Sequence, residues 1–472
     1  MRTKAPLLLA LTALLAAGCS TVPPYARPDA DAPASFGVAM PPAPLPPVSD
    51  SGWWGAFHSS ELDGLIARAL AANNDLAAAA ARLAEAQGQA RIAGAGQYPT
   101  LAIGGGGAAQ TGDPTSTTPS DAHQHSSSTS LTAQASYELD FWGRNRAAAR
   151  SGKALAAASA FDRDTLAIST ASTTAGIYFQ ILSLAERIRT AERIAADARR
   201  VLALVEAQHQ VGIATLLQIE QQRTVVASFE GAVPVLRQQQ EQAEHALAIL
   251  LALPPRAYVP RSLSLDGITL PEVRPGLPSA LLLRRPDIRA AEERLRSANF
   301  DVGVARAAFL PSLSLTGQAG GASNALANML SPIGFASAAA SLLAPVFDGG
   351  RLGGQLHYDR AHVVELTATY RQTALTAFGE VEDALTARQR VMEAEQSAIT
   401  AEAAARHAAQ LSEAQFRLGV IDLLTLLDTQ RALYQAQDTL LQLRLQRLQA
   451  VIALYRALAG GTAALSPTVA QK

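Results

Sequence analysis

The chain has 472 residues, of which 49% are hydrophobic and 5% aromatic, and its formal net charge is −1. This length allows a large core or two to three domains, and the near-neutral charge excludes the basic field of a nucleic-acid-binding protein. Much of the hydrophobic fraction is alanine, which lets helix backbones approach closely. We therefore expect many helices packed side by side.

Residues 1–18 have the pattern of a lipoprotein signal peptide. Arg2 and Lys4 precede an apolar run at 7–17 that is too short to span a bilayer. Small residues then precede Cys19, as lipoprotein processing requires, so we predict that the Cys19 thiol carries diacylglycerol. Ala16 departs from the usual lipobox, where Leu is commoner, and an ordinary secretory signal with a chance cysteine is the alternative. Cys19 is the single cysteine, which excludes disulfides and cysteine metal sites after lipidation.

Residues 19–52 are rich in proline and alanine, which favours an extended N-terminal tether. The remaining chain contains two copies of one module, at 53–254 and 279–461. A linker at 255–278 joins the two copies, and a tail follows at 462–472. Tyr98-Pro99-Thr100-Leu101 returns as Leu310-Pro311-Ser312-Leu313, for example. A repeat of roughly 200 residues is too long for a solenoid, so we expect two copies of one supersecondary unit.

Each repeat contains two predicted strands, at about 100–111 and 130–141 and at about 312–320 and 333–347. The alternation is strict at 130–141, where apolar and polar residues take turns. A polar loop, 112–129, is expected between the first two strands. Four strands cannot close a barrel, which needs about eight, so a membrane sheet would need several copies, and three would supply twelve. A soluble hairpin packed on a helical body is the alternative.

Long helices are predicted at 144–252 and 351–458. No proline interrupts residues 144–210, a segment that would reach about 100 Å as a helix. Near the C-terminus an apolar stripe recurs every seven residues, which predicts a coiled-coil seam. Its members are Leu427, Tyr434, Leu441, Leu448 and Tyr455.

Two helix turns fall at equivalent places in the repeats. Gly212 and Gly419 suit the left-handed conformation that ends a helix, and Thr215 and Asp422 suit the N-cap of the next one. The turn tips are apolar, which is unusual for a solvated loop and suggests a docking surface. The apolar tip residues are Val211, Ile213, Leu418, Val420 and Ile421.

Leu424, Asp428 and Arg431 follow the second turn on one helix face. One interpretation is an exposed intrahelical ion pair worth a few tenths of a kcal/mol. The other is a constriction, because copies of these residues around a symmetry axis would form stacked rings. The first-repeat counterparts, Leu217, Gln221 and Thr224, lack the charges.

Several short stretches resemble enzyme motifs, but each lacks a feature that the motif requires. The glycines at 104–107 are followed by a polar loop, and Ser151-Gly152-Lys153-Ala154 lacks the leading Gly and closing Ser/Thr of a phosphate-binding loop. His357 and His362 have the wrong spacing for two metal ligands on one helical turn. His123 and His125 lie among serines, where solvated side chains are commoner than ligands. We expect no catalytic residue, metal or cofactor.

At the helix turns and in the motifs quoted below, the chain resembles the TolC-like outer-membrane factor family, specifically its NodT-type lipoprotein branch serving resistance-nodulation-division pumps. The match covers nearly all of the mature chain. Its motifs include Trp53-Trp54, Asn74-Asp75-Leu76, Arg285-Pro286-Asp287-Ile288 and Leu427-Asp428-Thr429-Gln430-Arg431. The fold class that the resemblance implies is membrane α+β: three chains form a twelve-stranded outer-membrane β-barrel, four strands per chain, continued by a periplasmic α-helical barrel.

The resemblance implies a passive exit duct for small molecules expelled by an inner-membrane transporter. A lipid-anchored homotrimer would stand in the bacterial outer membrane and extend into the periplasm. Leu424, Asp428 and Arg431 would close its periplasmic end, and the two turns would meet a periplasmic adaptor protein. Two alternatives remain open: a lipid-anchored coiled-coil scaffold without a pore, and an exit duct for protein secretion. Nothing in the sequence names the transported substrate.

Overall fold

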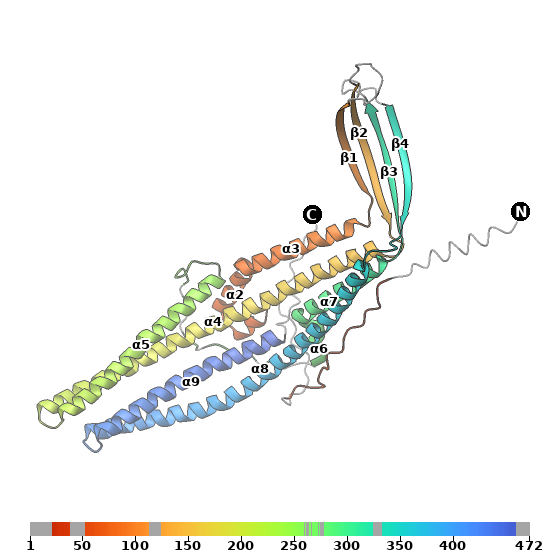
Figure 1. Ribbon diagram of the computed structural model, residues 1–472. Coiled ribbons are helices and arrows are strands. Elements are labelled where there is room, and N and C mark those ends of the chain that lie inside the picture. The colour runs from red at the N-terminus through yellow and green to blue at the C-terminus, as the bar shows by residue number, and fades with distance from the viewer. Residues whose placement is uncertain are drawn as a thin grey trace. The chain divides into compact units, whose positions relative to one another are not determined.

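The computed structural model, shown in Figure 1, describes residues 21–37, 52–112, 124–258, 260, 264–265, 267–271, 273, 278–323 and 333–458. The predicted signal peptide, Cys19, His123, the side chain of His125 and the tail at 462–472 lie outside the described part. The chain divides into two compact units. The coil unit comprises Asp29–Ala81, Ala160–Arg289 and Arg371–Lys472, and the sheet unit comprises Met1–Pro28, Arg82–Ser159 and Ala290–Tyr370.

The helices have matched lengths in the two halves of the chain. α4 and α8 have 67 residues each, α5 and α9 have 35 each, and α3 and α7 have 22 each. These equal lengths support the predicted duplication. No helix in the described ranges is both long and apolar enough to cross a membrane. The helices in chain order are η1 (Trp53–Phe57), α2 (Ser60–Ala72), α3 (Asn74–Ala95), α4 (Arg144–Gln210), α5 (Leu216–Leu250), α6 (Pro278–Arg284), α7 (Pro286–Ala307), α8 (Arg351–Arg417) and α9 (Leu423–Ala457).

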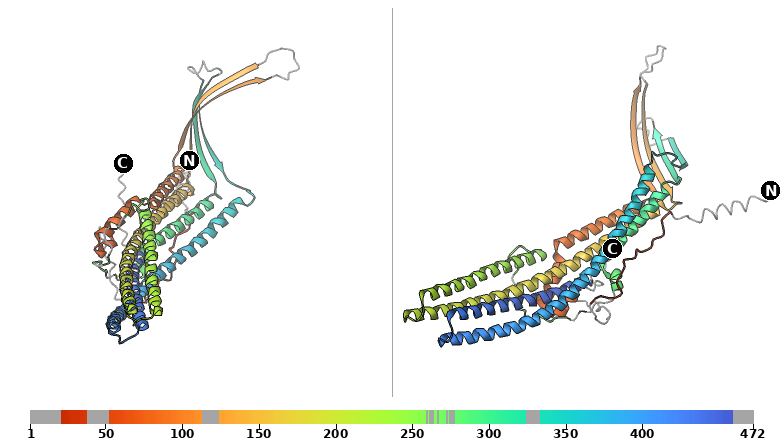
Figure 2. Two further views of the ribbon diagram at one scale, coloured as in Figure 1. Left: turned by 90° about the vertical axis from the view of Figure 1, so that its left-hand side faces the viewer. Right: turned by 60° about the horizontal axis from the view of Figure 1, so that its bottom comes forward.

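In the coil unit, α5 runs back beside α4 and α9 runs back beside α8, as Figure 2 shows. The predicted seven-residue stripe on α9 is buried at four of its positions, which confirms the coiled-coil seam. At the fifth position, the Tyr434 ring is half-buried and packs on Phe229 of α5, with 5.4 Å between ring centroids. At the other end of the stripe, the Tyr455 ring stacks on Trp53 at 5.1 Å.

Arg285, just before α7, holds three segments of the coil unit together. It is buried, and its guanidinium lies 2.6 Å from the Asp287 carboxylate and 2.7 Å from that of Glu380 on α8. It also donates a hydrogen bond to the carbonyl oxygen of Ala457 at the end of α9. The motif quoted above for the resemblance therefore has a structural role in this unit.

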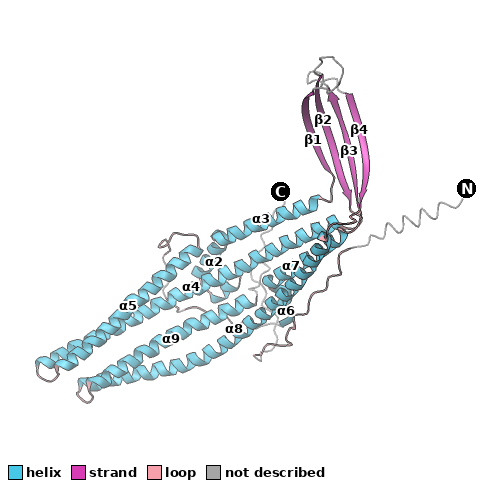
Figure 3. Ribbon diagram, viewed as in Figure 1, coloured by secondary structure: helices cyan, strands magenta, loops and turns pink. Residues whose placement is uncertain are grey.

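The sheet unit contains one antiparallel sheet, coloured magenta in Figure 3, with the strand order β1-β2-β3-β4. The four strands per chain predicted from the sequence are confirmed. The strands are β1 (Thr100–Gly112), β2 (Gln124–Leu139), β3 (Ser312–Ser323) and β4 (Ile333–Leu343).

Five strand boundaries differ from the predicted ones, and the two largest differences are at the start of β2 and the end of β4. Residues 124–129, expected in a polar loop, belong to β2 and pair with 107–112 of β1. A backbone ladder needs no apolar side chain, so the alternation of 130–141 marked only part of the strand. β4 ends at Leu343, short of the predicted 347, and Pro345 follows, which has no N–H for a ladder.

Across β1, β2 and β3 the register separates an apolar face from a polar one, whereas Ile333 and Phe335 near the start of β4 lie on the polar side. Directly opposed residues point to the same side, so Tyr137 with Leu315 marks the apolar face and Gln134 with Gln318 marks the polar one. On the polar face, Ser314 and Ser341 are hydrogen-bonded at 2.8 Å. Every described residue of β4 is exposed, and Leu101 of β1 is 75% exposed. The apolar face is therefore not covered by the rest of the described chain.

Both edges of the sheet are open. Among the described residues, β1 pairs only with β2, and β4 pairs only with β3. A long strand with an unpaired row of N–H and C=O groups is a template for another chain. The sheet therefore offers two edges for pairing with another strand.

Residues 21–28, in the predicted tether, are extended but bound along one face of α7. Thr21 Oγ1 donates to the Gly303 carbonyl at 2.9 Å, and Asn299 donates to the Pro23 carbonyl at 2.9 Å. Arg27 forms an ion pair with the buried Glu292 at 2.8 Å. The α7 positions used are spaced three or four residues apart, which is the spacing of a single helix face: Glu292, Arg296, Asn299, Gly303 and Arg306.

Candidate functional site at the helix turns

The turn between α4 and α5 is closed by its own backbone. Gly212 has a φ of 78°, a conformation that glycine adopts without strain. The Ile213 N–H donates to the Gln208 carbonyl at 2.9 Å, which ends α4. Thr215 then begins α5 with a capping box, because its hydroxyl accepts from the Gln218 N–H while the Gln218 side chain accepts from the Thr215 N–H.

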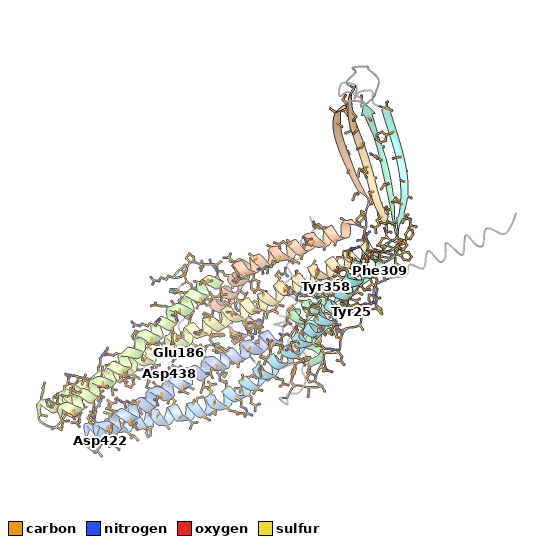
Figure 4. The ribbon with its side chains drawn as sticks, viewed as in Figure 1. Tyr25, Glu186, Phe309, Tyr358, Asp422 and Asp438 are labelled. Carbon is orange, nitrogen blue, oxygen red and sulfur yellow. The ribbon has the colours of Figure 1, made fainter. Side chains whose placement is uncertain are left out.

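The turn between α8 and α9 repeats this geometry. Gly419 has a φ of 70°, and the Val420 N–H donates to the Gln415 carbonyl at 2.9 Å. Asp422, labelled in Figure 4, caps α9 by accepting from the Thr425 N–H at 2.9 Å. Hydrogen bonds from Thr425 lower the pKa of the Asp422 carboxyl. The cap stays charged, which suits the positive end of the helix dipole.

Apolar side chains project from both turns. Val211 and Ile213 are 71% and 73% exposed, and Leu418 and Val420 are 79% and 68% exposed. Ile421, also expected at the tip, instead packs against the core behind the turns, whereas Leu216, which was not expected there, is exposed. Apolar residues at the tips of two tight turns suggest a surface that is covered by a partner.

A core lies directly behind the turns and joins both hairpins. It contains Val205 and Ala214 from the first hairpin and Phe416 and Leu426 from the second. Because these side chains form one buried cluster, the two turns lie at the same end of the coil unit (Figure 2). The tips are therefore held rigidly while their outer residues stay exposed.

Leu424, Asp428 and Arg431 lie together on one exposed face of α9. Leu424 is 64% exposed, and both charged residues are exposed as well. Asp428 and Arg431 form no ion pair with each other or with another described residue. The spacing permits an intrahelical ion pair, but none forms between these two side chains in the part of α9 that the structure describes. Their charges remain available to groups outside the protomer.

Two polar contacts behind the tip were not predicted. Ser412 of α8 and Thr429 of α9 are hydrogen-bonded through their hydroxyls at 2.6 Å. At the repeat-equivalent position, Gln222 of α5 is fully buried and donates to the Ala198 carbonyl of α4 at 2.8 Å. Gln222 follows Gln221 in an uninterrupted polar stretch, and only its place in the repeat distinguishes it.

The described residues contain no group of three or more His, Cys, Asp or Glu side chains arranged to hold a metal ion. The predicted lipidation site, Cys19, lies outside the described part of the chain. The candidate site at the tip is therefore a surface. It consists of two apolar turns and one face of α9 that carries opposite charges.

The sequence is similar to known proteins of one family over most of its length. The family model "Outer membrane efflux protein" matches residues 65–253 and 277–460. The pyoverdine export outer membrane protein OpmQ of Pseudomonas putida is 40% identical over 448 residues, which cover 92% of this chain and 95% of OpmQ. The cation efflux system protein CusC of Escherichia coli K12 is 32% identical, over 95% of this chain and 98% of CusC.

Solved structures show the same fold. The outer-membrane channel OprN superposes with a TM-score of 0.86 at 29% identity, over 94% of this chain and all of that one. The open state of the Neisseria gonorrhoeae MtrE outer membrane channel superposes with a TM-score of 0.84 at 28% identity, over 94% and 99% of the two chains. These proteins are channels and not enzymes.

Proposed function

Because the chain belongs to the outer membrane efflux protein family, we propose that three copies form the exit duct of a tripartite efflux pump in the outer membrane. The observation that carries this proposal is the sheet, which has two open edges and an uncovered apolar face. If β1 of one copy pairs with β4 of the next, three copies give a closed twelve-stranded barrel without edges.

The two faces of the sheet suit that position. The apolar face would meet lipid, and the polar face, with Gln134, Gln318 and the Ser314–Ser341 pair, would line a water-filled lumen. The strap at 21–28 supports an anchoring role for the N-terminus. In this proposal Cys19 carries the lipid, and the bound strap limits how far the anchor can move from the sheet unit.

Leu424, Asp428 and Arg431 form the periplasmic gate in this proposal. In a trimer, three copies of the exposed α9 face would point toward the axis and give an apolar ring beside two charged rings. Asp428 and Arg431 have no described partner in their own copy, which leaves them free to pair between copies. MtrE, solved in an open state, supports a duct with more than one state.

The two turns form the contact with a periplasmic adaptor protein. Val211, Ile213, Leu418 and Val420 supply exposed apolar surface, and a trimer would present six turns at one end. An inner-membrane resistance-nodulation-division transporter would supply the cargo. A duct of this kind performs no chemistry, and a few kcal/mol of differential contact at the tip suffices to shift it between closed and open.

The cargo is set by the transporter in this proposal. OpmQ exports pyoverdine, whereas CusC belongs to a cation efflux system. Relatives of one fold therefore serve chemically different cargoes.

Ion conductance in a planar bilayer tests the duct and its gate together. We expect the wild type to show a small, mostly closed conductance and Asp428→Ala to show a larger one, because a charged ring is lost. Glu393→Ala is the matched control, because Glu393 is an exposed acidic residue of α8 far along the helix from the tip. A pore that is equally open in all three proteins would remove the gate assignment. No conductance, with a water-soluble protein once Cys19 is removed, would favour the scaffold.

A further inference from the structure

A cavity of about 310 Å³ in the coil unit lies between α4, α8 and α9, and its lining includes four arginines. Arg189 and Arg193 come from α4, Arg406 from α8 and Arg444 from α9. We call it the four-arginine pocket. Glu186, labelled on α4 in Figure 4, and Glu402 are its only carboxylates among the described lining residues.

Both carboxylates already have hydrogen-bond donors. Glu186 Oε1 accepts from the Leu265 N–H at 2.8 Å and from the Ser264 hydroxyl at 3.0 Å. Glu402 Oε1 accepts from the Arg406 guanidinium and from the Gln437 amide at 3.1 Å. These bonds occupy Oε1 of each carboxylate, and two carboxylates cannot neutralise four guanidinium groups.

The remaining guanidinium groups are poorly satisfied. Arg193 donates only to the Thr190 hydroxyl, at 3.3 Å, and forms no ion pair in the ranges that the structure describes. Arg189 stands 3.8 Å from Glu186, beyond hydrogen-bond distance. Arg444 stands 4.0 Å from Glu395, which already holds Arg447 at 2.7 Å. Each guanidinium carries five N–H donors, so the pocket has a large surplus of donors and of positive charge.

We propose that the four-arginine pocket binds a multivalent oxyanion of the phosphate class. Guanidinium forks match the oxygens of phosphate in pairs and form charge-assisted hydrogen bonds, and like charges crowded in one concave site are relieved by an anion. The donors come from three helices, so the bound anion bridges α4 to α8 and α9. It therefore stabilises this arrangement of the coil unit, and above the dissociation constant the stabilisation grows with the logarithm of the anion concentration.

Inorganic phosphate is the probe, and the full-length protein in detergent is the sample, so no membrane or pore is needed. We expect phosphate to raise the melting temperature when chloride is adjusted to keep the ionic strength constant, and calorimetry to detect binding. In Arg193→Gln and in Arg444→Gln, affinity should fall about tenfold or more, because charge-assisted hydrogen bonds are lost. Arg193→Lys, which keeps the charge but not the fork, should also bind more weakly.

Arg390→Gln is the matched control, because Arg390 is an exposed arginine of α8 paired with Glu393 and does not line the pocket. It should keep the wild-type response to phosphate. An equal response in all variants would mean a general salt effect, and no binding to the wild type would equally overturn the site. Neither result depends on conductance, so the proposed duct is tested separately.

Discussion

Val22 occupies the space that a side chain on Gly303 would need. A Cβ at Gly303 would lie 2.5 Å from Val22 Cγ2 and 3.0 Å from Val22 Cα. The strap at 21–28 approaches α7 this closely only because residue 303 has no side chain. Hydrogen bonds on either side of this contact, at Thr21 and Pro23, fix the strap in register.

We expect Gly303→Leu to displace the strap, with an overpacking cost of about 1–3 kcal/mol. Chymotrypsin cleavage after Tyr25, followed by mass spectrometry, measures this, and the rate should rise by about fivefold or more. Trypsin is unsuitable because Pro28 follows Arg27. Gly354→Ala is the control, because nothing lies within 4 Å of a Cβ at that position. Equal cleavage of Gly303→Leu and wild type would show that the strap does not depend on this contact.

A second prediction concerns the loss of stability when the buried side chain of Arg285 is removed. Its replacement by Ala would leave Asp287, Glu380 and the Ala457 carbonyl without their shared donor. Because both carboxylates are partly exposed, we expect a loss of about 2–4 kcal/mol, at or below the range for a fully buried pair. The melting temperature in detergent checks this. The neighbouring Arg284 is exposed, and Arg284→Ala should change it little. A similar effect of both variants would contradict a special role for Arg285.

The sequence predicted features that repeat locally. The alternation in β2, the seven-residue stripe on α9 and the glycine turns each occupy one short stretch, so their periodicity or turn chemistry is visible. β1 was the weaker strand because the glycine run at 104–107 carries no side-chain pattern, and it is defined by its ladder with β2. The strap could not be predicted, because its contacts join residues far apart in the sequence, such as Arg27 and Glu292, which are 265 positions apart.

The helix turns likewise combine features that the sequence predicts with features that only the structure shows. Gly212, Gly419 and their caps followed from turn chemistry. The spacing of Asp428 and Arg431 permits an ion pair, and only the structure shows that none forms. The surplus of donors in the four-arginine pocket is equally hidden, since it depends on which carboxylates are already bound by Leu265 and Gln437.

Asp301 gives a pH prediction in the sheet unit. Burial, and to a lesser degree the nearby Asp359, raise its pKa, although Ser151 and His362 act in the opposite direction. The folded state therefore holds this proton more tightly than the unfolded chain. The stabilisation is complete below the unfolded pKa of about 3.8 and is lost as the pH rises through the folded value.

We therefore expect Asp301→Asn, which cannot ionise, to raise the melting temperature relative to wild type at pH 7. The difference should shrink toward pH 4, because the raised pKa favours protonation of the wild-type carboxyl as the pH falls. Asp75→Asn, at an exposed helical position, serves as the control for the general effect of removing an acidic charge. A difference that grows toward pH 4 would contradict the sign of this linkage.

Gln222 supports a prediction of increased stability. Its amide is fully buried, and Nε2 donates to the Ala198 carbonyl, but Oε1 has no hydrogen-bond partner among the described residues. A buried carbonyl without a donor is unfavourable, whereas replacing a buried polar group by an apolar group of similar shape is often neutral or stabilising. We expect Gln222→Met to stabilise the protein by about 1 kcal/mol, visible as a higher melting temperature in detergent. The adjacent Gln221 is exposed, so Gln221→Met should stay within about 0.5 kcal/mol of wild type. If Gln222→Met lowers the melting temperature instead, the hydrogen bond from Nε2 to the Ala198 carbonyl outweighs the cost of the unpaired Oε1, and the prediction is wrong.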